Sequence, residues 1–310
     1  MEFRFTEDQL LLAQSVRDYL AGTHGAEVLR RLDAEGPRDS AIWQGLVEMG
    51  LTGLLVPEAQ GGLGMGLVEA TLIAVECGRA CLAEPLVDTA FVGVPWLTAQ
   101  GRVDELGAIV TGECQLTLPH AANPWVADAE GAPLTSVDPL RLLAARPEEA
   151  SDDPLLLDLG ALMAAAQLVG LGDAMLLQAT EYAKVRQQFG QPIGAFQAIK
   201  HQLASCAVAI EFAKPVVWRA GAALQAGEAH AAVHVSHAKL AATDAAIIAA
   251  ETAIQVHGAM GYTYEVDLHF WMKRSWALAG AWGDRAFHLK RIDEAVLGGS
   301  LPIGAKHTFA

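Results

Sequence analysis

The chain has 310 residues, which is long for a single hydrophobic core and predicts two or three structural units. Apolar residues make up 52% of the chain and charged residues only 18%, a composition that favours large buried interfaces, including contacts between subunits. The formal net charge of −15 argues against nucleic acid or an anionic membrane as a partner.

The start of the chain and its cysteines bear on location and redox state. Charged residues interrupt any hydrophobic start at Glu2, Arg4, Glu7 and Asp8, so we expect no signal peptide. No uncharged run reaches the length of a membrane span. Both features favour a cytoplasmic protein that does not bind a membrane. The cysteines form no CxxC pair, which predicts reduced, buried thiols: Cys77, Cys81, Cys114 and Cys206.

Residues 1–106 are predicted to form an N-terminal helical domain. Thr6 and Gln9 fit a capping box, so a helix begins next to them. Further helices are expected near 41–49, 67–80 and 85–99. The glycine-rich stretch 61–66 is predicted to be a connecting loop, because a dinucleotide fingerprint needs a strand directly before it and none is indicated there.

The pattern changes over residues 107–154, which we expect to form a reduced β region. Short apolar runs predict strands. A turn is expected at 128–131. The expected strands are 108–110, 115–118, 125–127, 134–137 and 140–143.

From Leu155 the chain is predicted to be helical almost to its end, which gives a mainly α fold overall. Four long periodic runs predict an up-down four-helix bundle over residues 155–300, with a kink at Pro215. Three histidines share one face of the third run, but no carboxylate or HExxH pattern accompanies them, so we expect a histidine stripe and no metal site. The four runs are 155–185, 195–225, 231–254 and 266–295, and the histidines are His230, His234 and His237.

Two short motifs stand at the ends of these helices. The first reads Arg-Gln-Gln-Phe-Gly over 186–190, followed by Pro-Ile and Phe-Gln, and the second reads Ile-Gln-Val-His-Gly-Ala-Met-Gly-Tyr over 254–262. On spacing alone, Arg186 fits a helix-capping arginine as well as a phosphate ligand. Together the two motifs resemble the signatures of the acyl-CoA dehydrogenase family. The resemblance covers residues 1 to about 299, and includes the N-terminal order of Val-Pro-Glu before Gly-Gly-Leu-Gly.

The resemblance implies FAD as the cofactor, with the C-terminal helices of one subunit holding the ADP half of a neighbour's FAD. Arg186 would contact the pyrophosphate, with Gln188 donating nearby and Phe189 packing against the adenine side. Gln255 and the backbone of Gly258 would complete the cradle. We call these five the nucleotide-end residues. Ala259 stands where the family usually has a second glycine.

The sequence departs from the family in two respects. The middle region is about half its usual length and lacks the Thr-Glu-x-x-x-Gly-Ser-Asp and Trp-Ile/Val-Thr/Ser segments that surround the flavin ring. The catalytic glutamate of the family is also missing. One family location lies in a segment that usually reads Glu-Gly and here reads Gly-Ala-Trp-Gly-Asp over 280–284. The other location corresponds to Gly160, with Gln167 two turns further on.

The family removes a proton and a hydride from an acyl-CoA thioester, so the missing base leaves the catalytic residue unassigned. Glu181, Glu251 and Glu265 lie near the motifs, where helix-surface or capping roles are expected. These features indicate the incomplete subunit of an α₂β₂ acyl-CoA dehydrogenase that acts on bulky acyl-CoAs, including steroid side chains. An electron-transfer flavoprotein is the implied electron acceptor. The alternatives are a self-sufficient homo-oligomeric dehydrogenase and a flavin-free structural or regulatory subunit.

Overall fold

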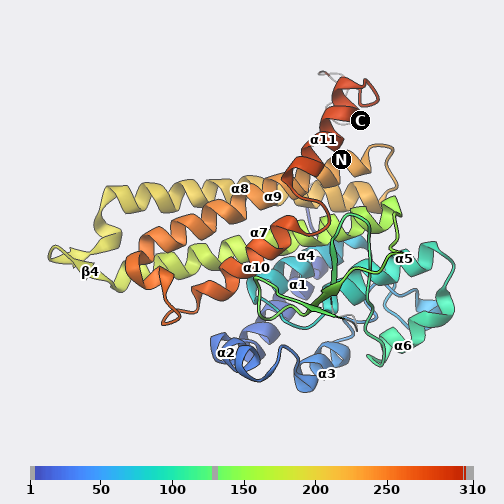
Figure 1. The fold of residues 1–310 in the computed structure, drawn as a ribbon, viewed down its shortest axis with the longest axis horizontal. Helices are drawn as coiled ribbons and strands as arrows, with labels where there is room; N and C mark the ends of the chain where they lie inside the picture. Colours follow the sequence, from blue (N-terminus) through green and yellow to red (C-terminus); the bar gives the residue numbers. More distant parts are fainter. Residues whose placement is uncertain (1–3, 128–131, 303, 305–310) are drawn as a thin grey trace.

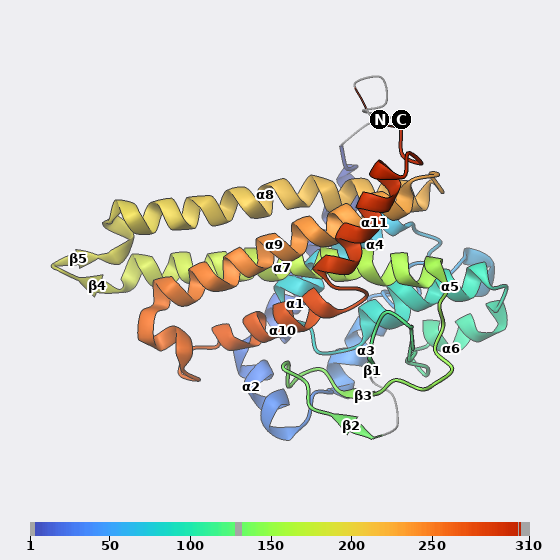
Figure 2. The ribbon, with the colours of Figure 1, turned by 45° about the horizontal axis from the view of Figure 1, so that its top comes forward.

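A computed structural model describes residues 4–127, 132–302 and 304. The protein is mainly helical, with N-terminal helices on one side of a long central helix and further C-terminal helices on the other (Figure 1). A small sheet lies beside the N-terminal helices, below the shorter C-terminal helix α10 in Figure 2. The fold class expected from the sequence is therefore confirmed.

The N-terminal part begins with the predicted cap. The backbone N–H of Gln9 donates to Thr6 Oγ1 at 3.2 Å, and the Gln9 side chain accepts from the Thr6 N–H at 2.9 Å. A helix that the sequence analysis did not anticipate, α2, follows α1. The elements here are α1 (Glu7–Thr23), α2 (Ala26–Glu35), α3 (Ser40–Glu48), η1 (Glu58–Gln60), α4 (Leu67–Arg79), the π-helix η2 (Val87–Gly93) and α5 (Val94–Ala99).

The glycine-rich stretch 61–66 connects the 3₁₀-helix η1 to α4, so no strand precedes it, as expected. The predicted helix over 85–99 starts as the wider η2 and continues as α5.

The middle region contains less strand than the sequence predicted. The expected strand at 108–110 is wrong: these residues belong to α6 (Leu106–Val110), because Leu106 and Ile109 are both buried at helical spacing. Residues 115–118 form no strand, and the expected turn at 128–131 lies outside the described residues. The elements found are η3 (Val103–Glu105), β1 (Trp125–Ala127), β2 (Pro133–Leu134) and β3 (Leu143–Ala145), in the antiparallel order β1-β3-β2.

The C-terminal part has three long helices, as predicted, but its fourth predicted helix is two shorter ones. The break falls at residues 281–284, which we call the α10–α11 loop. Trp282 has φ +57° and Gly283 has φ +92°, conformations that a helix does not allow, and Asp284 then caps α11. The helices are α7 (Pro154–Val185), α8 (Gln197–Gln225), α9 (Ala231–His257), α10 (Leu268–Gly280) and α11 (Arg285–Leu297).

Helix α7 is the centre of the core. Glycines let it approach α4 closely: a Cβ on Gly170 would lie 1.9 Å from the Val75 carbonyl oxygen, and a Cβ on Gly78 would lie 2.1 Å from that of Gln167. Helix α7 is long and apolar enough to cross a bilayer, with a mean hydropathy of 1.8, but 94% of that window is buried inside the protein. Its apolar character is therefore explained by its place in the core.

A buried ion pair fastens the middle region to α10. Arg274 Nε donates to Asp138 Oδ2, and Arg274 Nη1 donates to the Leu82 carbonyl at 2.7 Å. Both side chains are almost fully buried. Removing either partner would leave a buried charge uncompensated, so this pair fixes the small sheet against the helices.

Candidate functional site

The first motif forms a short hairpin between α7 and α8 that extends beyond the end of the helices (Figures 1 and 2). Helix α7 ends at Val185, and the Arg186 N–H still donates to the Tyr182 carbonyl at 2.9 Å. Strands β4 (Gln187–Gln188) and β5 (Gln191–Pro192) then pair antiparallel. Phe189 and Gly190 join them with φ of +52° and +82°, the positive pair that a tight two-residue hairpin needs.

This hairpin presents two of the predicted residues to solvent. Phe189 is 91% exposed, and its ring contacts Phe196 edge-on with centroids 6.1 Å apart. A non-glycine residue at positive φ is uncommon, so the turn directs a large aromatic ring outward at a cost in backbone energy. Gln188 is also exposed. The 3₁₀-helix η4 (Ile193–Ala195) leads from the hairpin into α8.

Arg186 lies at the base of the hairpin and is exposed. Its carbonyl accepts from the Ile193 N–H at 2.8 Å, so the backbone is held on both sides. Among the described residues, its guanidinium makes no hydrogen bond or ion pair. The nearby Lys184 pairs with Glu181 at 2.5 Å instead. An unpaired guanidinium on a fixed backbone suits recognition of a phosphate from outside the chain.

The second motif meets the first at the same end of the helices. Helix α9 ends at His257, whose ring stacks on Tyr182 with centroids 4.3 Å apart. His257 Nδ1 also lies 2.7 Å from the Ala253 carbonyl oxygen. This aromatic pair, which sequence reasoning missed, joins the last turn of α7 to the last turn of α9. Because it holds the two helix ends together, the nucleotide-end residues from both motifs share one surface.

Gly258 opens the backbone at this surface. It has φ +62° and ψ −136°, a combination that is accessible almost only to glycine, and no other group lies within 4 Å of where a Cβ would be. Gln255, one turn earlier, is exposed. The 3₁₀-helix η5 (Gly258–Tyr262) continues the surface. The structure therefore gathers the exposed Arg186, Gln188, Phe189 and Gln255 and the open backbone of Gly258 at one end of the molecule.

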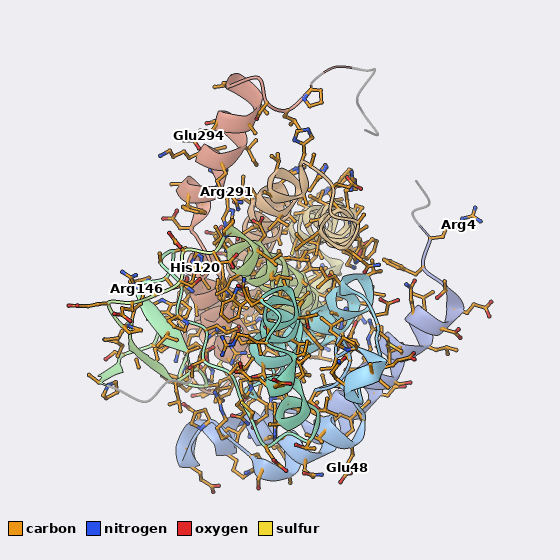
Figure 3. The ribbon with its side chains drawn as sticks, turned by 90° about the vertical axis from the view of Figure 1, so that its right-hand side faces the viewer. Arg4, Glu48, His120, Arg146, Arg291 and Glu294 are labelled. Atoms are coloured by element: carbon orange, nitrogen blue, oxygen red, sulfur yellow. The ribbon has the colours of Figure 1, made fainter. Side chains whose placement is uncertain are left out.

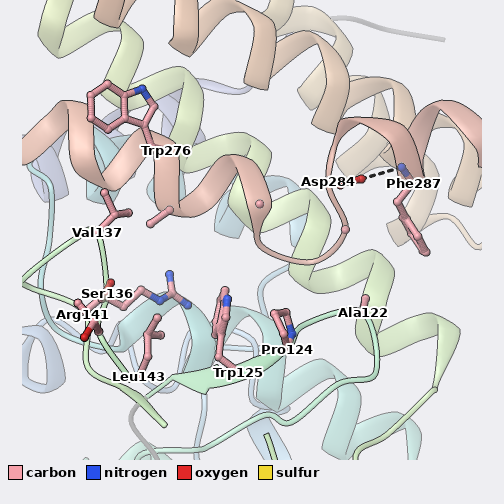
Figure 4. Close-up of a pocket in the computed structure, with 14 residues that line it drawn as sticks. Ala122, Pro124, Trp125, Ser136, Val137, Arg141, Leu143, Trp276, Asp284 and Phe287 are labelled. Carbon is pink, nitrogen blue, oxygen red and sulfur yellow. Dashed lines mark hydrogen bonds between the residues drawn. The ribbon is translucent and has the colours of Figure 1, made fainter. Parts of the chain in front are cut away.

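A cavity lies elsewhere, between the small sheet and the helices α10 and α11 (Figure 4). Its volume is about 630 Å³, and Trp125, Trp276 and Phe287 form aromatic walls. Arg141 also faces it, but the guanidinium is paired with Asp88 at 2.9 Å and lies over the Trp125 ring at 5.5 Å. Asp284 is the one carboxylate among the residues that line this cavity in the described part of the chain.

Asp284 does not have the environment of a catalytic base. Its Oδ1 accepts from the Phe287 N–H at 2.8 Å, which caps α11. The adjacent Arg285 pairs with Asp244 at 3.1 Å and not with Asp284. Glu181, Glu251 and Glu265 are all exposed, as expected for helix-surface residues.

Of the two places where the resemblance implies a glutamate, the segment 280–284 holds only Asp284, which caps α11, and the other place is Gly160. Gly160 is buried in α7. Gln167 is buried too, and its amide nitrogen donates to the Met163 carbonyl at 3.3 Å. Three groups that sequence reasoning missed surround the α10–α11 loop: Asn123, Lys239 and His288.

Burial controls the protonation of these groups. Lys239 Nζ donates to the Leu278 and Ala279 carbonyls, both at 2.9 Å. Burial lowers the pKa of Lys239 to about 7. Burial, with the nearby Lys239 charge, lowers the pKa of His288 to about 4. Lys239 thus satisfies carbonyls in the last turn of α10 and, at 3.4 Å, that of Gly283, and His288 Nε2 lies 2.9 Å from the Trp282 carbonyl oxygen, so their first role is to hold the loop.

The histidines on α9 contain no metal centre in the described part of the chain, where no group of three or more histidine, cysteine or acidic residues has suitable geometry. Burial lowers the pKa of His234 and of His237, which favours neutral rings packed along the helix.

Two parts of the chain match family domains. Residues 155–297 match the acyl-CoA dehydrogenase C-terminal domain, and residues 6–101 match the N-terminal domain. The acyl-CoA dehydrogenase IpdE2 of Mycobacterium tuberculosis is 30% identical over 316 residues, which cover 94% of this chain and 98% of that protein.

Two solved structures have the same fold. The ChsE4-ChsE5 complex from Mycobacterium tuberculosis superposes with a TM-score of 0.79 at 20% identity, over 96% of this chain and 99% of that chain. A variant of the Tcur3481-Tcur3483 steroid ACAD gives a TM-score of 0.80 at 22% identity, over 96% and 99%. The near-complete match to IpdE2, together with the two domain matches, shows that this chain belongs to the acyl-CoA dehydrogenase family.

Proposed function

We propose that this chain is the incomplete subunit of an FAD-dependent acyl-CoA dehydrogenase. It grips the ADP half of a flavin whose reactive ring and catalytic base belong to a second, unlike subunit. One contrast within the described residues carries the proposal. The exposed Arg186 guanidinium lacks a partner at the nucleotide end, whereas the cavity beside the α10–α11 loop has no available carboxylate.

The residues present fit the ADP half of FAD. A pyrophosphate needs a positively charged donor and close backbone approach, and Arg186 and Gly258 offer these from two helix ends that the Tyr182–His257 stack holds together. The exposed ring of Phe189 offers an apolar face for the adenine side. Gln188 and Gln255 add amide donors and acceptors around the same surface.

The reaction needs a base that none of the candidate carboxylates named above supplies. Bound FAD supplies the hydride acceptor, and a carboxylate must remove the α-proton of the acyl thioester. General-base catalysis contributes a factor of about 10²–10⁴ in rate. Asp284 is held as a helix cap, Glu181 and Glu251 are exposed on helices, and Glu265 is exposed in the turn before α10. The base therefore comes from the partner.

An α₂β₂ assembly of this chain with a second acyl-CoA dehydrogenase-like subunit explains both halves of the contrast. ChsE4-ChsE5 and Tcur3481-Tcur3483 each bear the names of two proteins, which supports pairing of unlike chains in this family. The steroid ACAD supports a bulky acyl-CoA as the substrate class. The oxidised product is the 2-enoyl-CoA of a β-oxidation step in lipid metabolism. The electrons pass to an acceptor such as an electron-transfer flavoprotein in the cytoplasm.

The visible absorption spectrum tests this proposal. The chain is purified alone and, separately, after co-expression with an acyl-CoA dehydrogenase-like protein encoded beside it. We expect the chain alone to be colourless and the co-purified assembly to be yellow. The flavin band of the assembly should bleach when a bulky acyl-CoA is added, because substrate oxidation reduces FAD.

Two other results would contradict the proposal. A yellow chain that bleaches with acyl-CoA on its own would establish a self-sufficient homo-oligomer. A chain that stays colourless, and that adds nothing to the flavin content of its co-purified partner, would establish a flavin-free structural or regulatory subunit.

A further inference from the structure

Trp282 has an unusual conformation for a tryptophan. Its φ of +57° lies in the left-handed region, which is costly for a residue with a bulky aromatic side chain. The side chain is nevertheless 4% exposed. The adjacent cavity is lined by Gly280, Gly283 and Asp284 from this part of the chain but not by the Trp282 ring. The backbone strain therefore turns the indole away from the cavity and into the body of the protein.

The indole lies directly on Gly160 of α7. A Cβ on Gly160 would lie 2.1 Å from Cδ2, 2.4 Å from Cε2 and 2.5 Å from Cε3 of the Trp282 ring. No real side chain tolerates such distances, so the ring fills the whole of the space that any residue other than glycine would need at this position.

The surrounding residues hold Trp282 from three directions. Its backbone N–H donates to Asn123 Oδ1 at 2.7 Å, and its backbone carbonyl oxygen lies 2.9 Å from His288 Nε2. The ring of His120 lies 5.9 Å from the indole, and Figure 3 shows His120 on the segment that leads into the small sheet. Lys239 secures the preceding end of α10 through two carbonyls. The middle region, α9 and α11 thus hold the backbone on which the indole is mounted, and His120 packs beside the ring itself.

This contact joins the two places where a base would be expected. By the resemblance, the segment 280–284 that contains Trp282-Gly283 is one implied location of the glutamate, and Gly160 is the other. Trp282 and Gly160 are 122 positions apart in the chain (282 − 160), and here one packs on the other. We infer that Trp282 is an internal plug that excludes a carboxylate from both positions at once. This deepens, and in its catalytic meaning rests on, the proposed function.

A double-mutant cycle in the full chain tests the plug. Gly160→Ala alone should lower the thermal midpoint by about 5 °C, because the added methyl meets the indole. Trp282→Ala alone should lower it by about 10 °C, because a large buried ring is lost. In the Trp282→Ala background, Gly160→Ala should shift the midpoint by less than about 2 °C, because the added methyl enters the space the ring has left.

Gly172→Ala is the matched control on the same helix. Its Cβ would meet the flexible Ile210 side chain at 3.3 Å, so this variant should change the midpoint by about 2 °C or less in either background. Additive effects of Gly160→Ala and Trp282→Ala would overturn the plug. If Trp282→Ala does not fold, Trp282→Leu replaces it, with the same expected loss of the Gly160→Ala penalty.

The flavin content of the co-purified assembly separates failure of the plug from failure of the proposed function. The Gly160→Ala/Trp282→Ala assembly, measured below its midpoint, should keep its FAD and its turnover per partner subunit, because Trp282 is buried inside this chain, away from the nucleotide-end residues. Loss of turnover in a folded, yellow assembly would contradict the plug, since Trp282 would then take part in the chemistry. A colourless native assembly would contradict the proposed function and leave the stability cycle to decide the plug.

Discussion

The hairpin between α7 and α8 and the α10–α11 loop differ in how their polar groups are satisfied. We call them the hairpin end and the buried end. At the hairpin end, Arg186 and Phe189 are exposed, and the guanidinium lacks a hydrogen-bond partner among the described residues. At the other end, the α10–α11 loop is buried and tied by Asn123, Lys239 and His288. Both ends use backbone at positive φ, but one displays an aromatic ring and the other buries one.

This difference indicates that the hairpin binds a group from outside the chain and that the α10–α11 loop supports the core. Strained backbone persists only where the surroundings hold it, and it is worth keeping where it places a group for use. At the hairpin, the strain presents groups to something outside the chain. In the α10–α11 loop, the strain completes the core. We therefore interpret the first end as a binding surface and the second as a structural support.

The largest expected effect falls on the buried side. Replacing Arg274 with Ala should lower the free energy of unfolding by about 3–5 kcal/mol, because Asp138 would remain as an uncompensated buried carboxylate. Chemical denaturation followed by circular dichroism measures this loss. Arg285→Ala, which breaks the exposed pair with Asp244, is the control and should cost less than about 1 kcal/mol. Equal losses of unfolding free energy in both variants would show that the buried pair is no more important for stability than the exposed pair.

Acid should lower the free energy of unfolding through groups at the buried end, and not through groups near the hairpin. Burial lowers the pKa of His288 from 6.5 to about 4, so the unfolded chain binds a proton below pH 6.5 that the folded chain does not. The stability contribution is complete above pH 6.5 and is lost as the pH falls toward 4, by roughly 3 kcal/mol. His288→Gln should flatten this part of the stability profile, whereas His201→Gln, at an exposed position near the hairpin, should not. Denaturant titrations from pH 4 to 8 provide the test.

A smaller effect is expected at the exposed end. Gly258→Ala should cost about 1–3 kcal/mol, because alanine must adopt backbone angles that glycine alone tolerates well. It should also weaken FAD binding by the assembly, since the methyl stands where the nucleotide approaches. Ala259→Gly is the matched control at the next position and should leave the thermal midpoint within about 3 °C of the native value. Unchanged FAD affinity in the Gly258→Ala assembly would place the nucleotide elsewhere.

Much of this arrangement could be predicted from the sequence, because periodicity and motif residues are local signals. The capping box at Thr6, the three long helices and both motifs lie where the sequence analysis expected them. The strands of the middle region were predicted poorly because short apolar runs such as 108–110 fit helix and strand equally well until burial decides.

What the sequence could not supply was contact between distant residues. The Tyr182–His257 stack joins positions at the ends of two helices, and the Trp282–Gly160 contact joins a loop to the beginning of α7. The break between α10 and α11 was missed for a related reason. Alanine and tryptophan at 281 and 282 fit a helical run, and only the buried space beside Gly160 explains why the chain turns there.

The central claim is that this chain holds the nucleotide end of a partner's FAD, and Arg186 tests it most directly. The measurement is the dissociation constant of FAD from the co-purified assembly, with Gln187→Ala as the control in the same hairpin. We predict that Arg186→Ala weakens FAD binding about 10–150-fold, the equivalent of one charge-assisted contact to phosphate, while Gln187→Ala changes it less than about threefold. An Arg186→Ala assembly that retains FAD as tightly as the native one would contradict the claim.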